Sequence, residues 1–298
     1  MQWVFRSGEL AKSGWDVVVD ESIAGWKHTG LRIGSLVDGS KLTIAADGKE
    51  RVIFALESTG LTVSYRLAGD SELQEVQLAG RASVFDSTTD HLYLPINTEI
   101  SISGDGRVAV GEAPASEAKS VALIKAADVE VFVRGAGRES RQVNNFGVPE
   151  ALDASRLIVC EVIVPSGNWS GIPPHKHDTF IEGVESNLEE IYYFEAQPAR
   201  GSNALTADPS GLLHVYASDE RPIEVTTLVR SGDVGLVPYG WHGPVAATPG
   251  SDLYFFNVMA GPDPDRSWNV TDDPNYAWIR ETWHHQDADP RLPFNERK

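Results

Sequence analysis

The chain has 298 residues, of which 25 are Lys or Arg and 43 are Asp or Glu, giving a net charge of −18 near neutral pH. This charge disfavours nucleic acid and anionic membrane surfaces as partners. The length predicts about two domains, the single cysteine, Cys160, excludes an intramolecular disulfide, and no apolar run reaches the roughly 18 residues that a membrane-spanning helix needs. The N-terminal residues lack the pattern of a signal peptide, so we expect a cytoplasmic protein.

The first half of the chain has the pattern of short strands separated by turns. Apolar residues alternate or run together over strand lengths, and Gly and Asp mark the turns between them. The strands expected here are residues 41–44, 51–54, 61–66 and 99–103. Strands that recur about every ten residues favour an antiparallel sandwich or barrel.

The polar stretch Arg134–Arg141 interrupts this pattern, and we interpret it as a connector between two β modules. Short helical turns are expected only near Glu150–Ser155 and Pro274–Ile279. The predicted fold is therefore all-β, with one module over residues 1–135 and a second over residues 136–298. The strands expected in the second half are residues 157–164, 188–194, 212–216, 223–229, 234–237 and 253–258.

Four residues of the second half have the chemistry of a metal site. His175 and His177 are two apart in a predicted strand, so their imidazoles face the same way, about 6.5 Å apart along the strand. Glu190 begins an apolar strand, with Glu189 as the alternative carboxylate, and His242 follows a Pro/Gly turn. An isolated H-x-H pair more often lies on a surface, but this combination favours a metal with open coordination positions.

These motifs resemble the cupin superfamily, which are small β-barrels with a metal in the barrel mouth. Two details differ from the general cupin pattern: one residue instead of two separates Gly240 from His242, and Ala196 stands where a Gly is usual. Both details fit a narrower resemblance, to the 5-deoxy-glucuronate isomerases of myo-inositol breakdown, which are related to 5-keto-4-deoxyuronate isomerase. The resemblance is carried by Arg134–Gly137, Arg141–Val143, Pro165–Ser170, Pro173–Asp178, Leu188–Tyr193, Asp252–Gly261, Asp273-Pro274 and Trp278.

This resemblance implies a two-module cupin, or bicupin, built from antiparallel jelly-roll barrels. It implies a metal-dependent aldose–ketose isomerase that converts 5-deoxy-glucuronate, a small uronate, to 5-dehydro-2-deoxy-gluconate. The family's metal ligands fall on His175, His177, Glu190 and His242, and the cofactor is a divalent metal such as zinc, manganese or iron. The first module has no H-x-H pair, so we expect it to be free of metal and to support assembly, which allows a homo-oligomer.

The general base is expected among the tyrosines. Tyr192 lies two residues after Glu190 on the same strand face, and Tyr216 lies on another strand of the same module. Both residues would line the barrel equally well without a catalytic role. The chain also differs from the family beside Tyr216, because Leu213 and His214 replace a usual Gln-Arg pair.

The carboxylate of a uronate requires a cation, and the sequence offers Arg141, Arg230 and Arg266 as candidates. Asn257 lies in an apolar run, where a buried amide requires hydrogen-bond partners, so we expect it beside the site. From this pattern we predict Arg141 and Asn257 as substrate-binding residues.

Two other functions are compatible with the same ligand types. One is a non-haem iron cupin dioxygenase, because three His and one Glu also hold iron in such enzymes. The other is a non-catalytic two-cupin sugar-binding protein, for which an incomplete set of ligands would be the indication. Oxygen consumption would identify the dioxygenase, and sugar binding without turnover would identify the binding protein.

Overall fold

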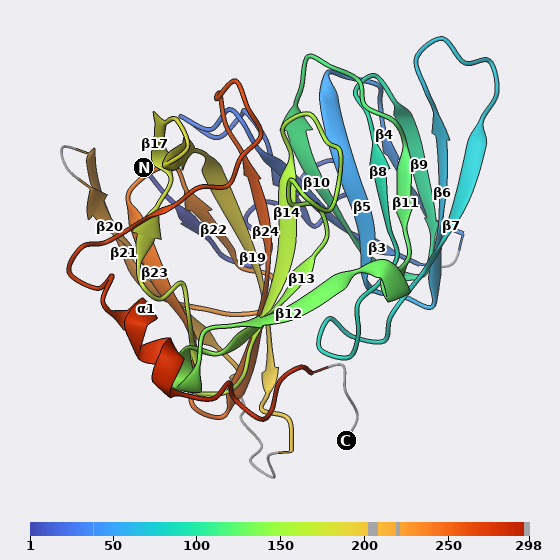
Figure 1. Cartoon of the computed structure of the whole chain (residues 1–298). Coiled ribbons are helices and arrows are strands. Elements are labelled where there is room, and N and C mark those ends of the chain that lie inside the picture. Colours follow the sequence, from blue (N-terminus) through green and yellow to red (C-terminus); the bar gives the residue numbers. More distant parts are fainter. Residues whose placement is uncertain (38, 202–207, 219–220, 295–298) are drawn as a thin grey trace.

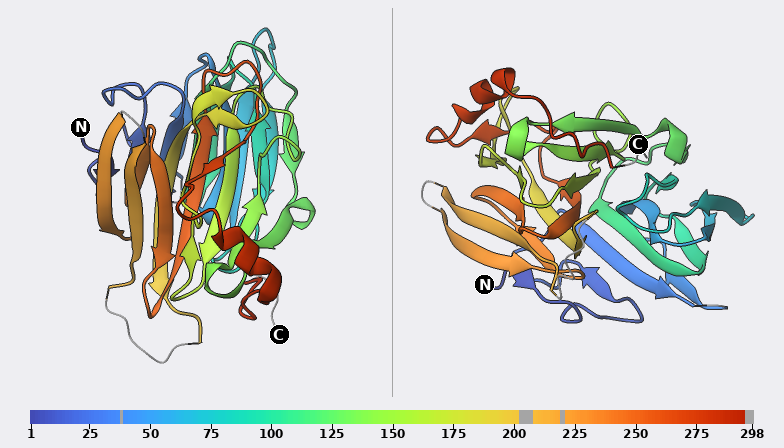
Figure 2. Two further views of the ribbon diagram at one scale, coloured as in Figure 1. Left: turned by 60° about the vertical axis from the view of Figure 1, so that its left-hand side comes forward. Right: turned by 90° about the horizontal axis from the view of Figure 1, so that it is seen from below.

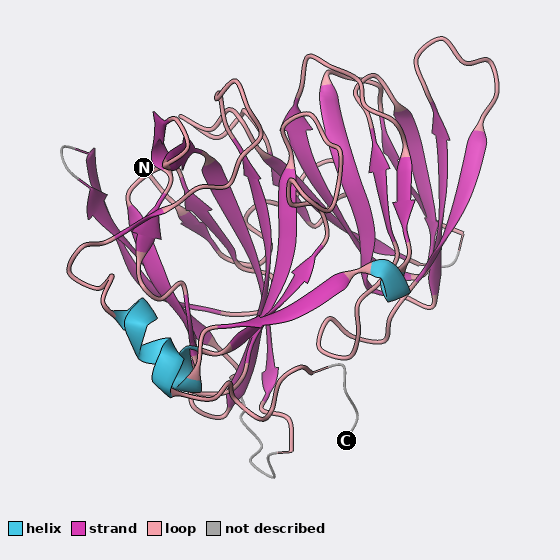
Figure 3. Ribbon diagram, in the orientation of Figure 1, coloured by secondary structure: helices cyan, strands magenta, loops and turns pink. Residues whose placement is uncertain are grey.

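The computed structural model describes residues 1–37, 39–201, 208–218 and 221–294, and it shows two β modules lying side by side (Figure 1). The prediction of an all-β fold is confirmed, since antiparallel sheets make up both modules (Figure 3). Most of the strands that were predicted from the apolar pattern lie within one or two residues of their expected positions; β22, for example, spans Val234–Val237.

The first module is a pair of facing antiparallel sheets. Its larger sheet has the order β11 (Ala122–Ile124), β8 (His91–Leu94), β5 (Lys49–Glu57), β10 (Gly106–Pro114), β3 (Gly30–Leu36) and β2 (Val17–Val19). Its smaller sheet has the order β4 (Lys41–Ile44), β9 (Glu99–Gly104), β6 (Gly60–Arg66) and β7 (Gln74–Ala79).

The second module has the same double-sheet architecture. Its larger sheet has the order β1 (Val4–Phe5), β22, β19 (Glu189–Pro198), β24 (Ser251–Ala260), β14 (Ile158–Val164), β13 (Arg141–Asn145) and β12 (Glu130–Arg134). Its smaller sheet contains β21 (Arg221–Val229), β20 (Gly211–Ser218), β23 (Trp241–Ala247), β16 (His175–Lys176) and β25 (Thr271–Asp272), with β15 (Trp169–Ser170) paired to β23. The strands β17 (Asp178–Ile181) and β18 (Glu185–Asn187) form a separate hairpin.

The larger sheets of the two modules pack against each other, and this position explains their apolar sequences (Figure 2). In β19, Ile191 and Tyr193 join the core between the modules, while Tyr192 and Phe194 point into the second barrel. A strand buried on both faces is apolar at successive positions rather than at alternate ones. The three cores therefore lie inside the first barrel, between the modules and inside the second barrel.

Buried polar contacts reinforce this junction. The carboxylate of Glu50 accepts hydrogen bonds from the backbone N–H groups of residues 155–157, at 2.5–2.7 Å. The fully buried guanidinium of Arg81, in the first module, forms an ion pair with Glu161 on β14, and the hydroxyl of Tyr254 donates to the same carboxylate at 2.6 Å. A buried charge left without its partner is costly, so each module depends on the other for these contacts.

The polar stretch 134–141 is not a connector between the modules, which corrects the interpretation from the sequence. It is the loop of the β12–β13 hairpin, in which Arg134 lies opposite Arg141, and both strands belong to the large sheet of the second module. The predicted boundary between residues 135 and 136 thus falls inside a hairpin. A polar, glycine-rich hairpin loop has the same composition as a linker, so composition could not distinguish them.

Helices are few and short in the described part of the chain. The segment expected to be helical near Glu150–Ser155 is a turn, and the one near Pro274–Ile279 is a series of turns that leads into α1 (Ile279–Thr282). Short 3-10 turns occur at Ala126–Asp128, Gly137–Glu139 and Trp283–His285. No helix among the described residues is long and apolar enough to cross a lipid bilayer.

Candidate metal centre

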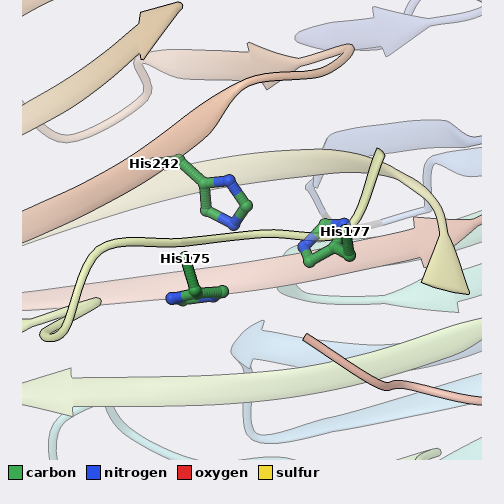
Figure 4. A group of neighbouring side chains, drawn as sticks. All are labelled: His175, His177 and His242. Carbon is green, nitrogen blue, oxygen red and sulfur yellow. The ribbon is translucent and has the colours of Figure 1, made fainter. Parts of the chain in front are cut away.

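Neighbouring strands bring the three predicted histidines together inside the second barrel (Figure 4). His175 on β16 lies directly opposite His242 on β23, and His177 follows β16 immediately. The turn before His242 requires Gly240, because its φ is +95° and a Cβ there would lie 2.7 Å from the carbonyl oxygen of Tyr216. The turn predicted from the sequence therefore directs this imidazole into the barrel.

The ligand atoms of the three rings converge on one point. One nitrogen from each histidine lies within 4.8 Å of the others, and the rings of His175 and His177 lie 4.5 and 4.7 Å from that of His242. Glu190, on the facing sheet, places Oε2 at 3.1 Å from Nε2 of His177 and 3.2 Å from Nε2 of His242. The four residues selected from sequence spacing are thus adjacent in the structure.

The orientation of each ring leaves its Nε2 atom free to bind a metal. Nδ1 of His175, His177 and His242 lies 3.2–3.3 Å from the backbone carbonyl of Pro173, Leu188 and Gly240, respectively. A carbonyl only accepts hydrogen bonds, so Nδ1 carries the proton and Nε2 keeps its lone pair. Nε2 of His242 is buried and has no hydrogen-bond partner among the described residues. Three imidazole nitrogens and one carboxylate oxygen fit a divalent metal.

The protonation preferences of His175 and Glu190 agree with this role. Burial lowers the pKa of His175 well below its usual value, and the charges of His242 and His177 lower it further. Burial alone would raise the pKa of Glu190, but the imidazoles of His177 and His242 that face it outweigh burial and hold that pKa well below its usual range. A neutral imidazole and an ionised carboxylate are the forms that bind metals.

The alternative carboxylate, Glu189, points the opposite way. Its oxygens accept hydrogen bonds from the backbone N–H groups of Lys27, at 3.1 and 3.2 Å, and of His28, at 2.7 Å, both in the first module. Successive residues of a strand face opposite sides of the sheet, so Glu189 joins the modules while Glu190 enters the barrel.

His175 lines an open cavity of about 140 Å³. Four of the predicted site residues, Glu190, Tyr192, Arg141 and Asn257, line it together with His175. Tyr192 and Asn257 are cross-strand neighbours on β19 and β24, and the amide of Asn257 donates to the carbonyl of Ile191 at 3.3 Å. Burial, followed by the charge of Glu190, raises the pKa of Tyr192 well above its usual value, so this phenol keeps its proton near neutral pH.

Tyr216, the second predicted candidate for the base, is not brought to this cavity. It alternates with the inward-facing Val215 on β20, and its hydroxyl donates to the carboxylate of Asp273. Its ring stacks on that of His214, with the ring centres 4.9 Å apart, on the outer face of the sheet. The substitution at His214 that distinguishes this chain from the family pattern therefore lies outside the cavity lining.

Of the three arginines considered for the substrate carboxylate, only Arg141 lines the cavity. Arg266 donates to three backbone carbonyls, and Arg230 forms an ion pair with Asp208 at the surface. Sequence reasoning missed Arg134, Arg280 and Trp268, which also line the cavity. One signal for Arg134 was available in the sequence. Arg134 begins the polar stretch 134–141, and if that stretch forms a hairpin, Arg134 lies opposite Arg141, which was already a candidate.

Comparison with solved structures defines the class of fold. The oxalate decarboxylase of Lactobacillus farciminis superposes with a TM-score of 0.61 at 11% identity, over 91% of this chain and 88% of that one. This likeness concerns the fold alone, and together with the two facing-sheet modules it confirms the predicted two-module cupin fold. A crystal structure of an IolB-like protein from Salmonella typhimurium is closer, with a TM-score of 0.81 and 32% identity over 94% of this chain and all of that one.

The sequence comparisons identify the family within that class. The model of the KduI/IolB family matches residues 3–279. The 5-deoxy-glucuronate isomerase of Geobacillus kaustophilus is 37% identical over 89% of this chain and 90% of its own length, and that of Geobacillus thermodenitrificans is 34% identical over 94% and 97%. The chain belongs to the KduI/IolB family.

Proposed function

We propose that this protein is the metal-dependent isomerase that converts 5-deoxy-glucuronate to 5-dehydro-2-deoxy-gluconate in myo-inositol breakdown. The relatives named for this activity are 34–37% identical over nearly the whole of both chains. The observation that carries the proposal is the convergence of three imidazole nitrogens and the Glu190 carboxylate at the edge of an open cavity. A divalent metal in such a site can stabilise the enediolate charge that develops in an aldose–ketose isomerisation.

His175, His177, Glu190 and His242 would hold the metal, with zinc, manganese and iron as the candidates. A divalent cation bound there would supply positive charge to the carbonyl and hydroxyl oxygens of the substrate while a proton moves between adjacent carbons. The three imidazoles are oriented for this before metal binds, because backbone carbonyls fix each ring.

Residues that line the cavity contribute further groups to the reaction. The hydroxyl of Tyr192, which keeps its proton near neutral pH, lies in the cavity beside Glu190 and can donate that proton to a substrate oxygen. Asn257 offers an amide at the neighbouring position of β24. The apolar side chains of Val143, Val162 and Phe255 line the same cavity and limit the access of water.

The proposal is tested by assaying purified protein with 5-deoxy-glucuronate before and after chelation, with an oxygen electrode in the same cell. We expect ketose to form without oxygen uptake, activity to be lost on chelation, and activity to return with one of the candidate metals. Oxygen uptake coupled to turnover would instead indicate a dioxygenase. Tight uronate binding without turnover, at full metal content, would indicate a binding protein. The cytoplasmic location and a homo-oligomeric state stay predictions.

A further inference from the structure

The cavity beside the histidines is positively charged, in a protein whose net charge is −18. Three arginines, Arg134, Arg141 and Arg280, line it, and Glu190 is the only carboxylate among the described lining residues. Oε2 of Glu190 faces His177 and His242, and no ion pair among the described residues joins Glu190 to these arginines. The arginines therefore create a local positive potential inside a negatively charged molecule.

Arg134 and Arg141 come from directly opposite positions of the β12–β13 hairpin. Neither forms an ion pair within the described part of the chain, and Nη1 of Arg141 donates only to the backbone carbonyl of Glu139, at 3.2 Å. Gly135, with φ at +75°, makes room for this arrangement, since a Cβ there would lie 2.9 Å from Nη1 of Arg141. Two adjacent guanidinium groups thus keep most of their N–H donors available.

Arg280 connects this pair to the candidate metal centre. Its guanidinium forms a two-pronged ion pair with Asp272, which lies opposite His175 in the β16–β25 pairing. Arg280 and Arg141 both lie over the ring of Trp283, at 5.5 and 5.6 Å from its centre. The indole therefore holds the two guanidinium groups near each other at one wall of the cavity.

This arrangement leaves positive charge without a counter-ion. Burial lowers the pKa of Arg141 to about 10, and the charges of Arg134 and Arg280 add to the effect, so the guanidinium remains charged near neutral pH but at a cost in free energy. A bound anion would reduce that cost. The planar fork of N–H donors matches a carboxylate, which accepts two parallel hydrogen bonds from one guanidinium.

We propose that Arg141 and Arg134 bind the substrate carboxylate and thereby set the specificity of this site for sugar acids over neutral sugars. The inference rests on the proposed function, in that it names which end of the substrate each part of the cavity binds. The carboxylate lies at the arginines and the hydroxyaldehyde end lies at the histidines. Arg280 is already neutralised by Asp272, so it supports the other two and binds the substrate less directly.

The test compares 5-deoxy-glucuronate with 5-deoxy-glucose, in which a neutral hydroxymethyl group replaces the carboxylate. For Arg141→Gln and Arg134→Gln we expect KM for the acid to rise about 10- to 100-fold, with metal content unchanged and little change in kcat/KM for the neutral sugar. Arg141→Lys keeps the charge but not the fork, so it should recover part of the affinity. Arg230→Gln, which removes a surface arginine, is the matched control and should behave as wild type.

The inference is wrong if both Gln variants, folded and loaded with metal, discriminate between the two sugars as the wild type does. If the wild-type protein turns over neither sugar, the proposed function fails, and the inference is decided by calorimetry with D-glucuronate and D-glucose. Tighter binding of glucuronate that Arg141→Gln abolishes would then support the arginine site. Equal binding of both sugars, or an effect of Arg230→Gln as large as that of Arg141→Gln, would overturn it.

Discussion

The two modules share an architecture of facing antiparallel sheets, but their interiors differ. The interior of the first barrel is a closed apolar core with residues such as Ile53, Leu61 and Ile102. The interior of the second barrel combines an apolar core with a group of three histidines and with a cavity lined by Glu190, Tyr192 and one of those histidines, His175. Among the described residues, no group of metal-binding side chains like these histidines occurs in the first module.

A buried histidine of the first module, His91, shows how the difference arises. His91 lies on β8 but points out of its barrel, where its ring stacks on Phe146 of the second module with the ring centres 4.6 Å apart. It is fully buried in the junction between the modules. The two barrels share one architecture, so the architecture alone does not determine function. The identity of the inward-facing side chains decides which barrel can carry out chemistry.

The largest effect is expected from removing a candidate ligand. His242→Ala should lower isomerase activity about 10⁴-fold, because several kcal/mol of charge stabilisation depend on the metal's geometry. The two remaining imidazoles and Glu190 should still bind metal, more weakly, and the fold should survive. Kinetics and metal analysis check this, with His214→Ala, a histidine on the outer face of the same module, as the control. Full activity in His242→Ala would remove the site as described.

The junction between the modules can be broken at its buried ion pair. Arg81→Met would leave Glu161 buried without its cation and should lower the free energy of unfolding by about 4 kcal/mol. Chemical denaturation measures this, and Arg66→Met, which removes an exposed pair with Glu99, should cost less than about 1 kcal/mol. Equal effects of the two substitutions would contradict a shared buried junction.

A pair of tyrosine variants distinguishes the role of the inner face of the second barrel from that of its outer face. Tyr192→Phe removes a hydroxyl in the cavity and should lower kcat about 100-fold with metal content unchanged. Tyr216→Phe removes a hydroxyl that bonds Asp273 outside the cavity, so its activity should stay within about threefold of wild type. Steady-state kinetics of both variants decide the point, and the reverse order of effects would assign the proton-transfer role to Tyr216.

The smallest effect concerns pH and the buried His91. Burial lowers its pKa from 6.5 to about 4, against weaker opposing effects of Glu161 and Asp90. Between these two pKa values His91 binds a proton in the unfolded chain but not in the folded protein. The stability that the buried, neutral His91 contributes is therefore present above pH 6.5 and is lost as the pH falls toward 4. Between pH 7 and pH 5, wild type should lose about 2 kcal/mol more than His91→Leu.

Denaturation at both pH values measures that difference. A variant at the exposed His285, such as His285→Leu, should follow the wild type. Identical pH dependence in wild type and His91→Leu would show that His91 is not held neutral in the junction.

The sequence could predict what depends on local periodicity. The strands that were predicted lie close to their expected positions, because apolar residues and turns recur at strand spacing. Alternation along one of them also predicted that Glu190 and Tyr192 share a face. The direction of Tyr216 could not be predicted, because both faces of its strand carry large side chains, including a leucine on each. Only the register with the strand that holds His242 distinguishes the inner face from the outer one.

The arginine wall lay beyond sequence reasoning for another reason. Arg134 and Arg141 come from a hairpin, and Arg280 comes from α1, 139 residues after Arg141. Only the fold brings the three to one cavity, where Arg141 and Arg280 lie over Trp283. Contacts between distant segments leave no periodic signal in a single sequence. The same limit explains the misread hairpin at residues 134–141, where pairing between two strands, and not composition, determines the structure.

The central claim is that one barrel of the two holds a metal, and the most direct measurement is anomalous X-ray scattering from crystals grown with zinc, manganese or iron. The account predicts one strong peak per chain, within bonding distance of His175, His177, Glu190 and His242, and none inside the first barrel. A peak inside the first barrel, or metal-replete crystals in which the second barrel is empty and the three histidines point apart, would contradict it.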